Sequence, residues 1–459
     1  MFANERSLLE RDIRDSASPS VLRRALRRSV AQTQREDLGK HASVESTALS
    51  REQRLRRAVL LSFGDPLPAQ CLELHDITER EWRNLTHWLD VSGLALYFLD
   101  RLIELQLTHI LPGHVLARLW QNMGDNTERT HGMITESLAI QRGFQEAALS
   151  YAVLKGFSLS PESVSRPELR HQFDLDFLIA EEAIIEARRV LGRLGYRLYA
   201  VSGRSWEFKK EEKIGISMKD FYKDTCGRTV ELHLNAPMPG GASILDRVEK
   251  RQLNGIDMPV LSRADLFLGQ GMHAYKHICG EFLRTAHLLE FYRHVLMRRQ
   301  DEMFWVELRS RAEDNLKASL GLGIVTLLIT SIMGEFAPPA FTEWTVDRLT
   351  PSVRLWVRLH GRRAVFGNVP GSKLYLLLQS EVEPSGRATR RSLWKALLPH
   401  RLPPEVVQAV NGESLSIRVR RYRMQLKYVL LRLRFHIVEG IRYGWEAYRW
   451  RRHMDRLTG

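Results

Sequence analysis

Two aspartates separated by one residue are the part of the sequence with the clearest chemical potential. In residues 173–179, FDLDFLI, Asp174 and Asp176 alternate with apolar side chains, which is the period of a half-buried β-strand. Two carboxylates on one outward face repel each other unless a cation lies between them, and Mg²⁺ is a hard cation that prefers oxygen ligands. The pattern therefore predicts a metal site or, if nothing binds there, an ordinary solvated strand face.

A second predicted strand favours the metal site. In residues 228–234, Glu231 and His233 share one face, and valine and leucines occupy the other. If this strand lies beside the aspartate strand, Glu231 becomes a third carboxylate on the same surface.

The segment just upstream carries groups suited to a phosphate. Residues 152–154 form a short apolar strand that runs into Lys155 and Gly156. A glycine lets the backbone approach a ligand closely, and a lysine beside it can meet a phosphate as a point charge. A ligand that carries a phosphate is thus a candidate for this part of the chain.

The motifs together resemble those of a known family. In chain order they are Leu154-Lys-Gly156, Arg170, Asp174-Leu-Asp-Phe-Leu-Ile179, Leu194-Gly-Tyr196 and Glu231-Leu-His233. They resemble the successive motifs of the bacterial uncharacterised nucleotidyltransferase family, within the polymerase-β-like nucleotidyltransferase superfamily. The resemblance extends from about residue 81 to about residue 338 and is specific between residues 154 and 233.

The resemblance implies metal-dependent nucleotidyl transfer. A nucleoside monophosphate would move from an NTP, expected to be ATP, to a hydroxyl or phosphate acceptor. Asp174 and Asp176 would hold the Mg²⁺ (or Mn²⁺) that binds the triphosphate, and with Glu231 they would hold a second ion that activates the acceptor. Such catalysis rests on positioning and electrostatics, so we expect no nucleophilic serine or cysteine.

Further residues have expected roles around the nucleotide. Lys155 would contact the triphosphate, and the backbone from Gly156 to Ser158 would cradle it. Arg170 would orient Asp174 or offset charge on the phosphate. The acceptor stays open, and it could be a sugar phosphate, a protein hydroxyl, a tRNA end or a peptide natural product.

Two departures from the family pattern keep a second function open. The usual Gly-Ser or Gly-Gly turn of the superfamily is here Gly156-Phe157-Ser158, and Leu234 replaces an aromatic residue that often follows Glu-Leu-His. The alternative is a catalytically reduced, transferase-like binding protein for nucleotide or RNA. The presence of all three carboxylates favours the enzyme.

Composition narrows the class and the compartment. The 459 residues, 44% hydrophobic and 27% charged, suit a soluble protein of two or three structural units. A net charge of +14 favours a polyanionic partner or ligand. The three cysteines form no paired motif, which indicates a reducing compartment. Because we find no signal-peptide pattern and no apolar run of the ~20 residues that cross a bilayer, we expect a cytoplasmic protein.

Periodicity predicts an α+β fold, and the resemblance implies that a mixed-sheet nucleotidyltransferase core is embedded in N- and C-terminal helical regions. The expected domains are a basic arm with a short helix at 19–34, a helical region, the transferase core, a second helical region, and a basic aromatic-rich tail, with bounds 1–58, 59–150, 151–261, 262–400 and 401–459.

The second helical region contains candidate substrate contacts. Ser262 caps a predicted helix on which His273 and His277 are four residues apart, which is a metal-ligand spacing. We find no third ligand in the sequence pattern, so core packing and contacts to a substrate phosphate are the other interpretations. Arg284, almost two turns beyond His277, is a further candidate phosphate contact, as is His233.

The C-terminal tail, residues 413–459, interleaves basic and aromatic residues. Such a helix could hold RNA by charge and stacking or lie on an anionic membrane surface. It could also bury its aromatic residues against the body and expose its arginines to water.

Overall fold

The computed structural model describes residues 49–210, 221–224, 228–235, 243–253, 256–313, 315–383, 393, 395–397 and 414–458. The helix predicted at 19–34 lies outside these residues. The chain divides into two compact units, Met1–Leu85 and Thr86–Gly459, and each is described here by itself. Among the described residues, no helix combines the length and apolarity required to cross a membrane.

The described part of the first unit is helical. Its elements are α4 (Arg51–Leu61), the 3-10 helix η1 (Ala69–Leu74) and the start of α5 (Glu79–Ser92). Ser50 caps α4 through a capping box, a device that satisfies the free N–H groups of a helix start. Arg51 ties these elements together through ion pairs with Glu73 and Glu81.

The second unit begins with helices that precede the sheet. They are the rest of α5, α6 (Ala95–Glu104) and α7 (Gly113–Glu146). The helical spacing of Leu94, Phe98, Leu102 and Leu105 predicts a helix, and α6 confirms it. The sequence also predicts a helix that begins at Pro112 and a separate segment over residues 127–149, whereas α7 is one continuous helix of 34 residues. A Cβ added at Gly124, inside α7, would meet no neighbouring group within 4 Å.

In the part of the chain that the structure describes, seven strands form one mixed sheet in the order β3-β4-β5-β2-β1-β7-β6. The strands are β1 (Tyr151–Leu154), β2 (Asp174–Ile179), β3 (Arg197–Ser202), β4 (Ser205–Lys209), β5 (Thr229–Leu234), β6 (Glu249–Leu253) and β7 (Ile256–Val260). β2 is antiparallel to β1 and parallel to β5. The predicted α+β class is therefore confirmed. The sequence also predicts a strand over 207–218; β4 covers its first residues, and residues 211–220 lie outside the described part.

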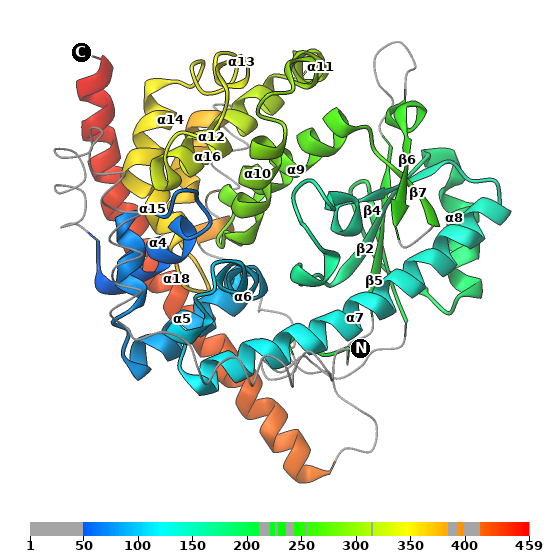
Figure 1. Cartoon of the computed structure of the whole chain (residues 1–459), viewed down its shortest axis with the longest axis horizontal. Helices are drawn as coiled ribbons and strands as arrows, with labels where there is room; N and C mark the ends of the chain where they lie inside the picture. Colours follow the sequence, from blue (N-terminus) through cyan, green and yellow to red (C-terminus); the bar gives the residue numbers. More distant parts are fainter. Residues whose placement is uncertain are drawn as a thin grey trace. The chain divides into compact units, whose positions relative to one another are not determined.

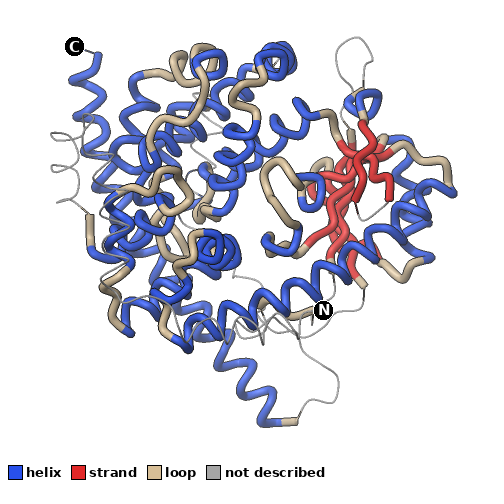
Figure 2. Tube along the Cα trace, in the orientation of Figure 1, coloured by secondary structure: helices blue, strands red, loops and turns tan. Residues whose placement is uncertain are grey.

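One face of the sheet is covered by α7 and by α8 (Ile184–Arg193). Leu175, Phe177 and Ile179 of β2 join Phe144 of α7 and Val190 of α8 in a single hydrophobic cluster. Figures 1 and 2 show α7 and α8 along one side of the strands and α9 and α10 on the other side. Because side chains alternate along a strand, both aspartates of β2 point away from α7 and α8.

The residues after the sheet that the structure describes are mainly helical. The helices are α9 (Arg263–Ile278), α10 (Ala286–Met297), α11 (Glu302–Glu313), α12 (Leu316–Met333), α13 (Pro339–Thr342), α14 (Pro351–Trp356), a π-helical turn (Val357–Gly361), α15 (Arg362–Val365), α16 (Tyr375–Val382) and α18 (Leu415–Thr458). Ser262 caps α9 by accepting a hydrogen bond from the Asp265 backbone, as predicted. The apolar run over 320–333 predicts a buried helix, which corresponds to α12; α12 begins four residues earlier.

The 44-residue helix α18 divides its aromatic residues between the body and the surface. Phe435 and Trp450 are buried, whereas Tyr422, Trp445 and Tyr448 are more than half exposed. Packing against the body thus accounts for only part of the aromatic content of the tail.

Candidate active site

The parallel pairing of β2 with β5 brings the three predicted carboxylates onto one surface. In this register Asp174 lies opposite Thr229, and Asp176 lies opposite Glu231. Partners opposite each other in a sheet project to the same face. The predicted juxtaposition of Glu231 with the aspartate pair is therefore present in the structure.

Asp176 is the most enclosed of the three acids. Only 5% of its surface is exposed, although the sequence pattern suggested an outward carboxylate. Its Oδ1 accepts hydrogen bonds from Lys155 Nζ at 3.1 Å and from His233 Nε2 at 2.8 Å. His233 Nε2 also lies 3.4 Å from Glu231 Oε2. These contacts explain how a charged side chain is tolerated at this depth, because buried charges require partners.

The two aspartates differ in electrostatic state. Burial, and then the negative charge of Asp176, raise the pKa of Asp174 to about 6. Burial acts on Asp176 in the same direction, but its hydrogen bond from His233 and the charge of Lys155 outweigh it and lower the pKa of Asp176. The charged form of Asp174 is thus disfavoured, and a bound cation would stabilise it.

The turn after β1 has a strained backbone. Lys155 has φ 51° and ψ −153°, and Gly156 has φ 47°. Positive φ is uncommon for a side chain such as lysine and costs energy. A Cβ on Gly156 would lie 2.6 Å from Gln172 Oε1, so a larger residue would displace this amide, which accepts a hydrogen bond from Arg170.

The same turn is fixed by its two following residues. Phe157 is buried in the cluster beneath the sheet, which gives the departure from the Gly-Ser pattern a packing role. The Ser158 backbone N–H and hydroxyl both donate to the Lys155 carbonyl oxygen, at 2.9 and 2.7 Å. Ser158 therefore holds the turn in shape through the groups that were expected to meet a triphosphate.

Arg170 belongs to a buried network behind the turn. Its Nε donates to Glu290 Oε1 at 3.1 Å, and its Nη1 donates to Gln172 Oε1 at 3.1 Å. The Tyr97 hydroxyl donates to the same Glu290 oxygen at 2.9 Å. The positive charge of Arg170 also opposes the rise in the pKa of Asp174. Sequence reasoning found Arg170 but missed Glu290 and Gln172, which no local pattern marks.

Arg284 is held by the fold. Its Nη2 donates to the His171 carbonyl oxygen at 2.7 Å, and a Cβ on Gly93 would lie 2.5 Å from its Nε. Gly93 has φ 77° and allows the chain to pass close to the guanidinium. The candidate phosphate contact is thus engaged with backbone in this structure.

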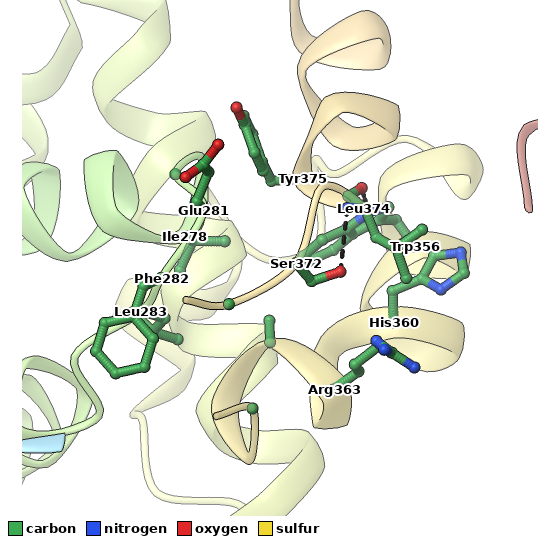
Figure 3. A pocket seen from close by; sticks show the side chains of 14 residues that line it. Ile278, Glu281, Phe282, Leu283, Trp356, His360, Arg363, Ser372, Leu374 and Tyr375 are labelled. Carbon is green, nitrogen blue, oxygen red and sulfur yellow. Dashed lines mark hydrogen bonds between the residues drawn. The ribbon is translucent and has the colours of Figure 1, made fainter. Parts of the chain in front are cut away.

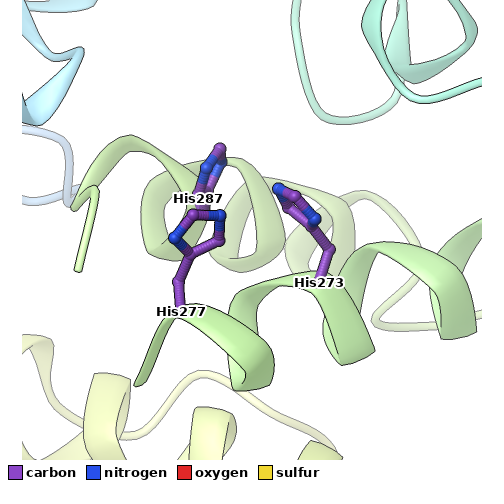
Figure 4. A group of neighbouring side chains, drawn as sticks. All are labelled: His273, His277 and His287. Atoms are coloured by element: carbon purple, nitrogen blue, oxygen red, sulfur yellow. The ribbon is translucent and has the colours of Figure 1, made fainter. Parts of the chain in front are cut away.

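Three histidines meet on α9 and α10. His273 and His277 project from successive turns of α9, and His287 comes from the first turn of α10 (Figure 4). The ring centroids are 4.7–4.8 Å apart. The sequence pattern missed His287, although a helix restarting at Thr285 after the break at Gly280 would have returned the chain to the same place.

A cavity with about 520 Å³ of empty volume links several predicted residues. It is lined by Leu154, Lys155, Leu159, Arg170, Leu261, Leu266, Gly269, Gln270, His273, His287 and Glu290. Another cavity, of about 380 Å³, lies between the chain around Glu281 and Trp356 to Tyr375 (Figure 3). None of the residues predicted to form the site is among the described residues that line it, so only the first cavity joins the predicted groups.

The family model of the uncharacterised nucleotidyltransferases matches residues 78–334. The chain belongs to this family. The match spans the whole sheet and every helix from α6 to α12, so it confirms the resemblance carried by the sequence motifs. No curated protein matches the chain.

Solved structures show only distant similarity to this nucleotidyltransferase. A solution structure of the antibiotic-resistance factor ANT(2'')-Ia shares 12% identity, with a TM-score of 0.30 over 40% of this chain and 95% of the other. The crystal structure of that factor with adenylyl-2"-tobramycin shares 14% identity, with a TM-score of 0.29 over 39% of this chain and 98% of the other. The crystal structure of an antigenic nucleotidyltransferase-like protein from Paracoccidioides brasiliensis shares 12% identity, with a TM-score of 0.26 over 44% of this chain and 91% of the other. The family match is the finding on which the assignment rests.

Proposed function

We propose that this nucleotidyltransferase is an active, metal-dependent enzyme whose catalytic carboxylates are Asp174, Asp176 and Glu231. The observation that carries the proposal is the pairing of Asp176 with Glu231 across adjacent parallel strands, on the face that also bears Asp174. Three carboxylates on one sheet face, beside a strained Lys155-Gly156 turn, are suited to a nucleoside triphosphate and its metal ion.

The donor set fits a divalent cation. One ligand atom from each of Asp176, Glu231 and His233 lies within 4.8 Å of the others. Asp174, whose pKa is raised by burial and then by the charge of Asp176, lies on the same face. The carboxylates would hold Mg²⁺ or Mn²⁺, which when bound offsets phosphate charge and makes an acceptor hydroxyl more acidic.

The remaining groups of the chain bind and orient. Lys155 would contact the triphosphate as a point charge, and Gly156 would let the phosphates approach the backbone. Arg170, held by Glu290 at 3.1 Å, would contribute positive charge from behind the turn to the field at Asp174. His233 would fix the orientation of the Asp176 carboxylate through its 2.8 Å hydrogen bond. ATP is the proposed donor, and a hydroxyl or phosphate is the proposed acceptor.

The structure offers a packing explanation for both departures that kept the binding-protein alternative open. Phe157 fills the core under the sheet, and Leu234 packs against the same cluster. Neither side chain lies on the carboxylate face. Leu234 follows His233 in β5 and so points to the opposite face of the sheet, and Phe157 is buried. This arrangement favours the enzyme.

The test is single-turnover transfer from α-labelled nucleotides to fractions of a cell lysate, with and without Mg²⁺. We expect label transfer from ATP that falls on the order of a thousandfold in Glu231→Gln. The matched control is Glu207→Gln, because Glu207 lies opposite Glu231 on β4, one strand further from Asp176, and it should keep the transfer rate. Nucleotide binding without transfer to any fraction would establish the binding protein instead.

We also propose that α18 lies on an anionic lipid surface. Ten apolar residues spaced three or four apart form a continuous exposed stripe along this helix, each 49–76% exposed: Leu415, Val419, Tyr422, Leu426, Leu430, Leu433, Ile437, Ile441, Trp445 and Tyr448. The helix carries twelve basic and three acidic residues. The net positive charge of the helix disfavours its association with a second copy of the same helix. Most of the stripe is aliphatic, and aliphatic side chains do not stack on bases, so a membrane surface fits better than RNA.

Vesicle binding tests this partner. The full chain should sediment with phosphatidylserine vesicles and only weakly with phosphatidylcholine vesicles. The double variant Leu430→Glu, Ile437→Glu should no longer bind either kind of vesicle. Met424→Glu is the matched control, since Met424 is exposed but lies two residues from the stripe positions 422 and 426, on another side of the helix. Binding to single-stranded RNA with no binding to vesicles would overturn the proposal.

A further inference from the structure

The histidine cluster of α9 and α10 has the composition of a metal site separate from the carboxylates. Its members are His273, His277 and His287, and the structure gives one ring nitrogen of each within 4.8 Å of the others. Figure 4 shows the three rings turned toward one another. His287 is buried and the other two are half-buried, so the cluster has a protected side and an approachable side.

The spacing requires only a small closure. In a tetrahedral zinc site with Zn–N bonds of about 2.0–2.1 Å, two ligand nitrogens lie about 3.3 Å apart. Imidazoles whose ligand atoms are within 4.8 Å of one another reach that separation by small side-chain rotations. Two ligands four residues apart on one helix and a third on the next helix form a rigid scaffold for such a site.

A carboxylate lies next to one nitrogen of the His287 ring. Glu290 Oε2 lies 3.6 Å from His287 Nδ1, which leaves Nε2 of this ring for a ligand. Histidine ligands of metals commonly present their second nitrogen to a carboxylate, which fixes the ring and increases its basicity. Glu290 is itself fixed by Tyr97 and Arg170, so this supporting shell is already built.

The burial of the cluster favours a metal over an anion. Burial is the main cause that lowers the pKa of all three histidines, that of His287 to about 4. Neutral imidazoles bind metals, whereas binding a phosphate would require protonated rings. Lys155, Arg170, Lys276 and Arg284 act on the cluster in the same direction as burial, and the charges of Lys155 and Arg170 are each paired with a carboxylate, Asp176 and Glu290 respectively.

We propose that His273, His277 and His287 bind a borderline transition-metal ion, with Zn²⁺ as the expected occupant. Imidazole ligands select such ions, whereas the carboxylate face selects Mg²⁺ or Mn²⁺. Three protein ligands leave a fourth position open. His273 and His287 line the 520 Å³ cavity that also contains Lys155, so the open position takes water or an oxygen of a molecule bound in that cavity.

Cobalt substitution tests the site in the full chain. Asp176→Asn with Glu231→Gln serves as the parent, because it removes the other cluster of His and carboxylate ligands found among the described residues. We expect this parent to bind one Co²⁺ with the strong visible absorbance of four-coordinate cobalt, to release it to Zn²⁺, and to be indifferent to excess Mg²⁺. Adding His277→Gln should weaken Co²⁺ and Zn²⁺ binding tenfold or more, whereas His131→Gln on the exposed side of α7, the matched control, should not.

X-ray absorption at the zinc edge gives a second measurement that does not depend on a histidine variant. Three imidazole ligands on the zinc-loaded parent would support the proposal even if His277→Gln failed to fold. One imidazole or none, unchanged Co²⁺ affinity in a folded His277→Gln protein, or stabilisation of the cluster by inorganic phosphate alone would overturn it.

Discussion

Asp174 and Asp176 are one pleat apart, yet we expect opposite effects on stability when each loses its charge in the metal-free protein. The Asp174 charge is opposed by burial and by Asp176, which raise its pKa to about 6. The Asp176 charge is stabilised by hydrogen bonds from Lys155 and His233. Asp174→Asn should therefore stabilise the fold, and Asp176→Asn should destabilise it.

The pKa of Asp174 sets the size and the pH range of the first effect. A carboxyl with an ordinary pKa of 3.8 and a folded pKa of about 6 is disfavoured as a charge in the folded state by about 3 kcal/mol, at 1.36 kcal/mol per pKa unit. Since Asp174 keeps some solvent contact, we expect on the order of 1–3 kcal/mol. The penalty is absent below about pH 4, where both states are protonated, and complete above about pH 7.

The second effect has a similar size. Asp176→Asn removes two hydrogen bonds to a charged group, and their loss should cost on the order of 1–3 kcal/mol.

Urea unfolding in EDTA at pH 4 and pH 8 provides the measurement, with Asp125→Asn on α7 as the control. Asp174→Asn should raise the midpoint at pH 8 and leave it unchanged at pH 4, and Asp176→Asn should lower it at pH 8. A lower midpoint for Asp174→Asn at pH 8, or a gain of equal size at both pH values, would refute the electrostatic reasoning.

Three further predictions concern the same neighbourhood. Gly156→Ala should destabilise the protein by 1 kcal/mol or more, as judged by thermal melting, because its Cβ would lie 2.6 Å from Gln172 Oε1 at a φ that favours glycine; an unchanged melting temperature would contradict this. Metal affinity at the carboxylates should fall as the pH drops through about 6, where Asp174 takes up a proton, and calorimetry should show no such fall in Asp174→Asn. Glu290→Gln should cost about 3 kcal/mol or more by leaving Arg170 buried without its ion pair; a melting temperature equal to that of the parent would exclude a structural role for the pair.

Short-range patterns predicted the elements that carry the carboxylates. The period-two alternation of residues 173–179 and 228–234 predicted both strands, and the parity of Glu231 placed it on the same side as the aspartates. The alternation succeeds because one face of each strand is buried against α7 and α8, which imposes the pattern on the sequence. The family motifs then identified the α+β core.

Long-range contacts were not predictable from those patterns. The burial of Asp176 depends on Lys155, 21 residues away, and on His233, 57 residues away. Arg170 meets Glu290 across 120 residues, and His287 joins the other two histidines only because α10 folds back against α9. Charged residues at such positions carry no periodicity, so only the packed structure reveals their partners.

The ion pair between Lys155 and Asp176 couples metal binding at the carboxylates to nucleotide binding at Lys155. While Nζ donates to Oδ1 at 3.1 Å, it competes with any metal ion for that oxygen, and a triphosphate offers the lysine another partner. Nucleotide binding would then release the carboxylate for the ion, and ion binding would release the lysine for the nucleotide. Thermodynamic linkage makes this coupling free energy reciprocal, so each ligand should raise the affinity of the other by the same factor, and Lys155→Met should reduce that factor toward one.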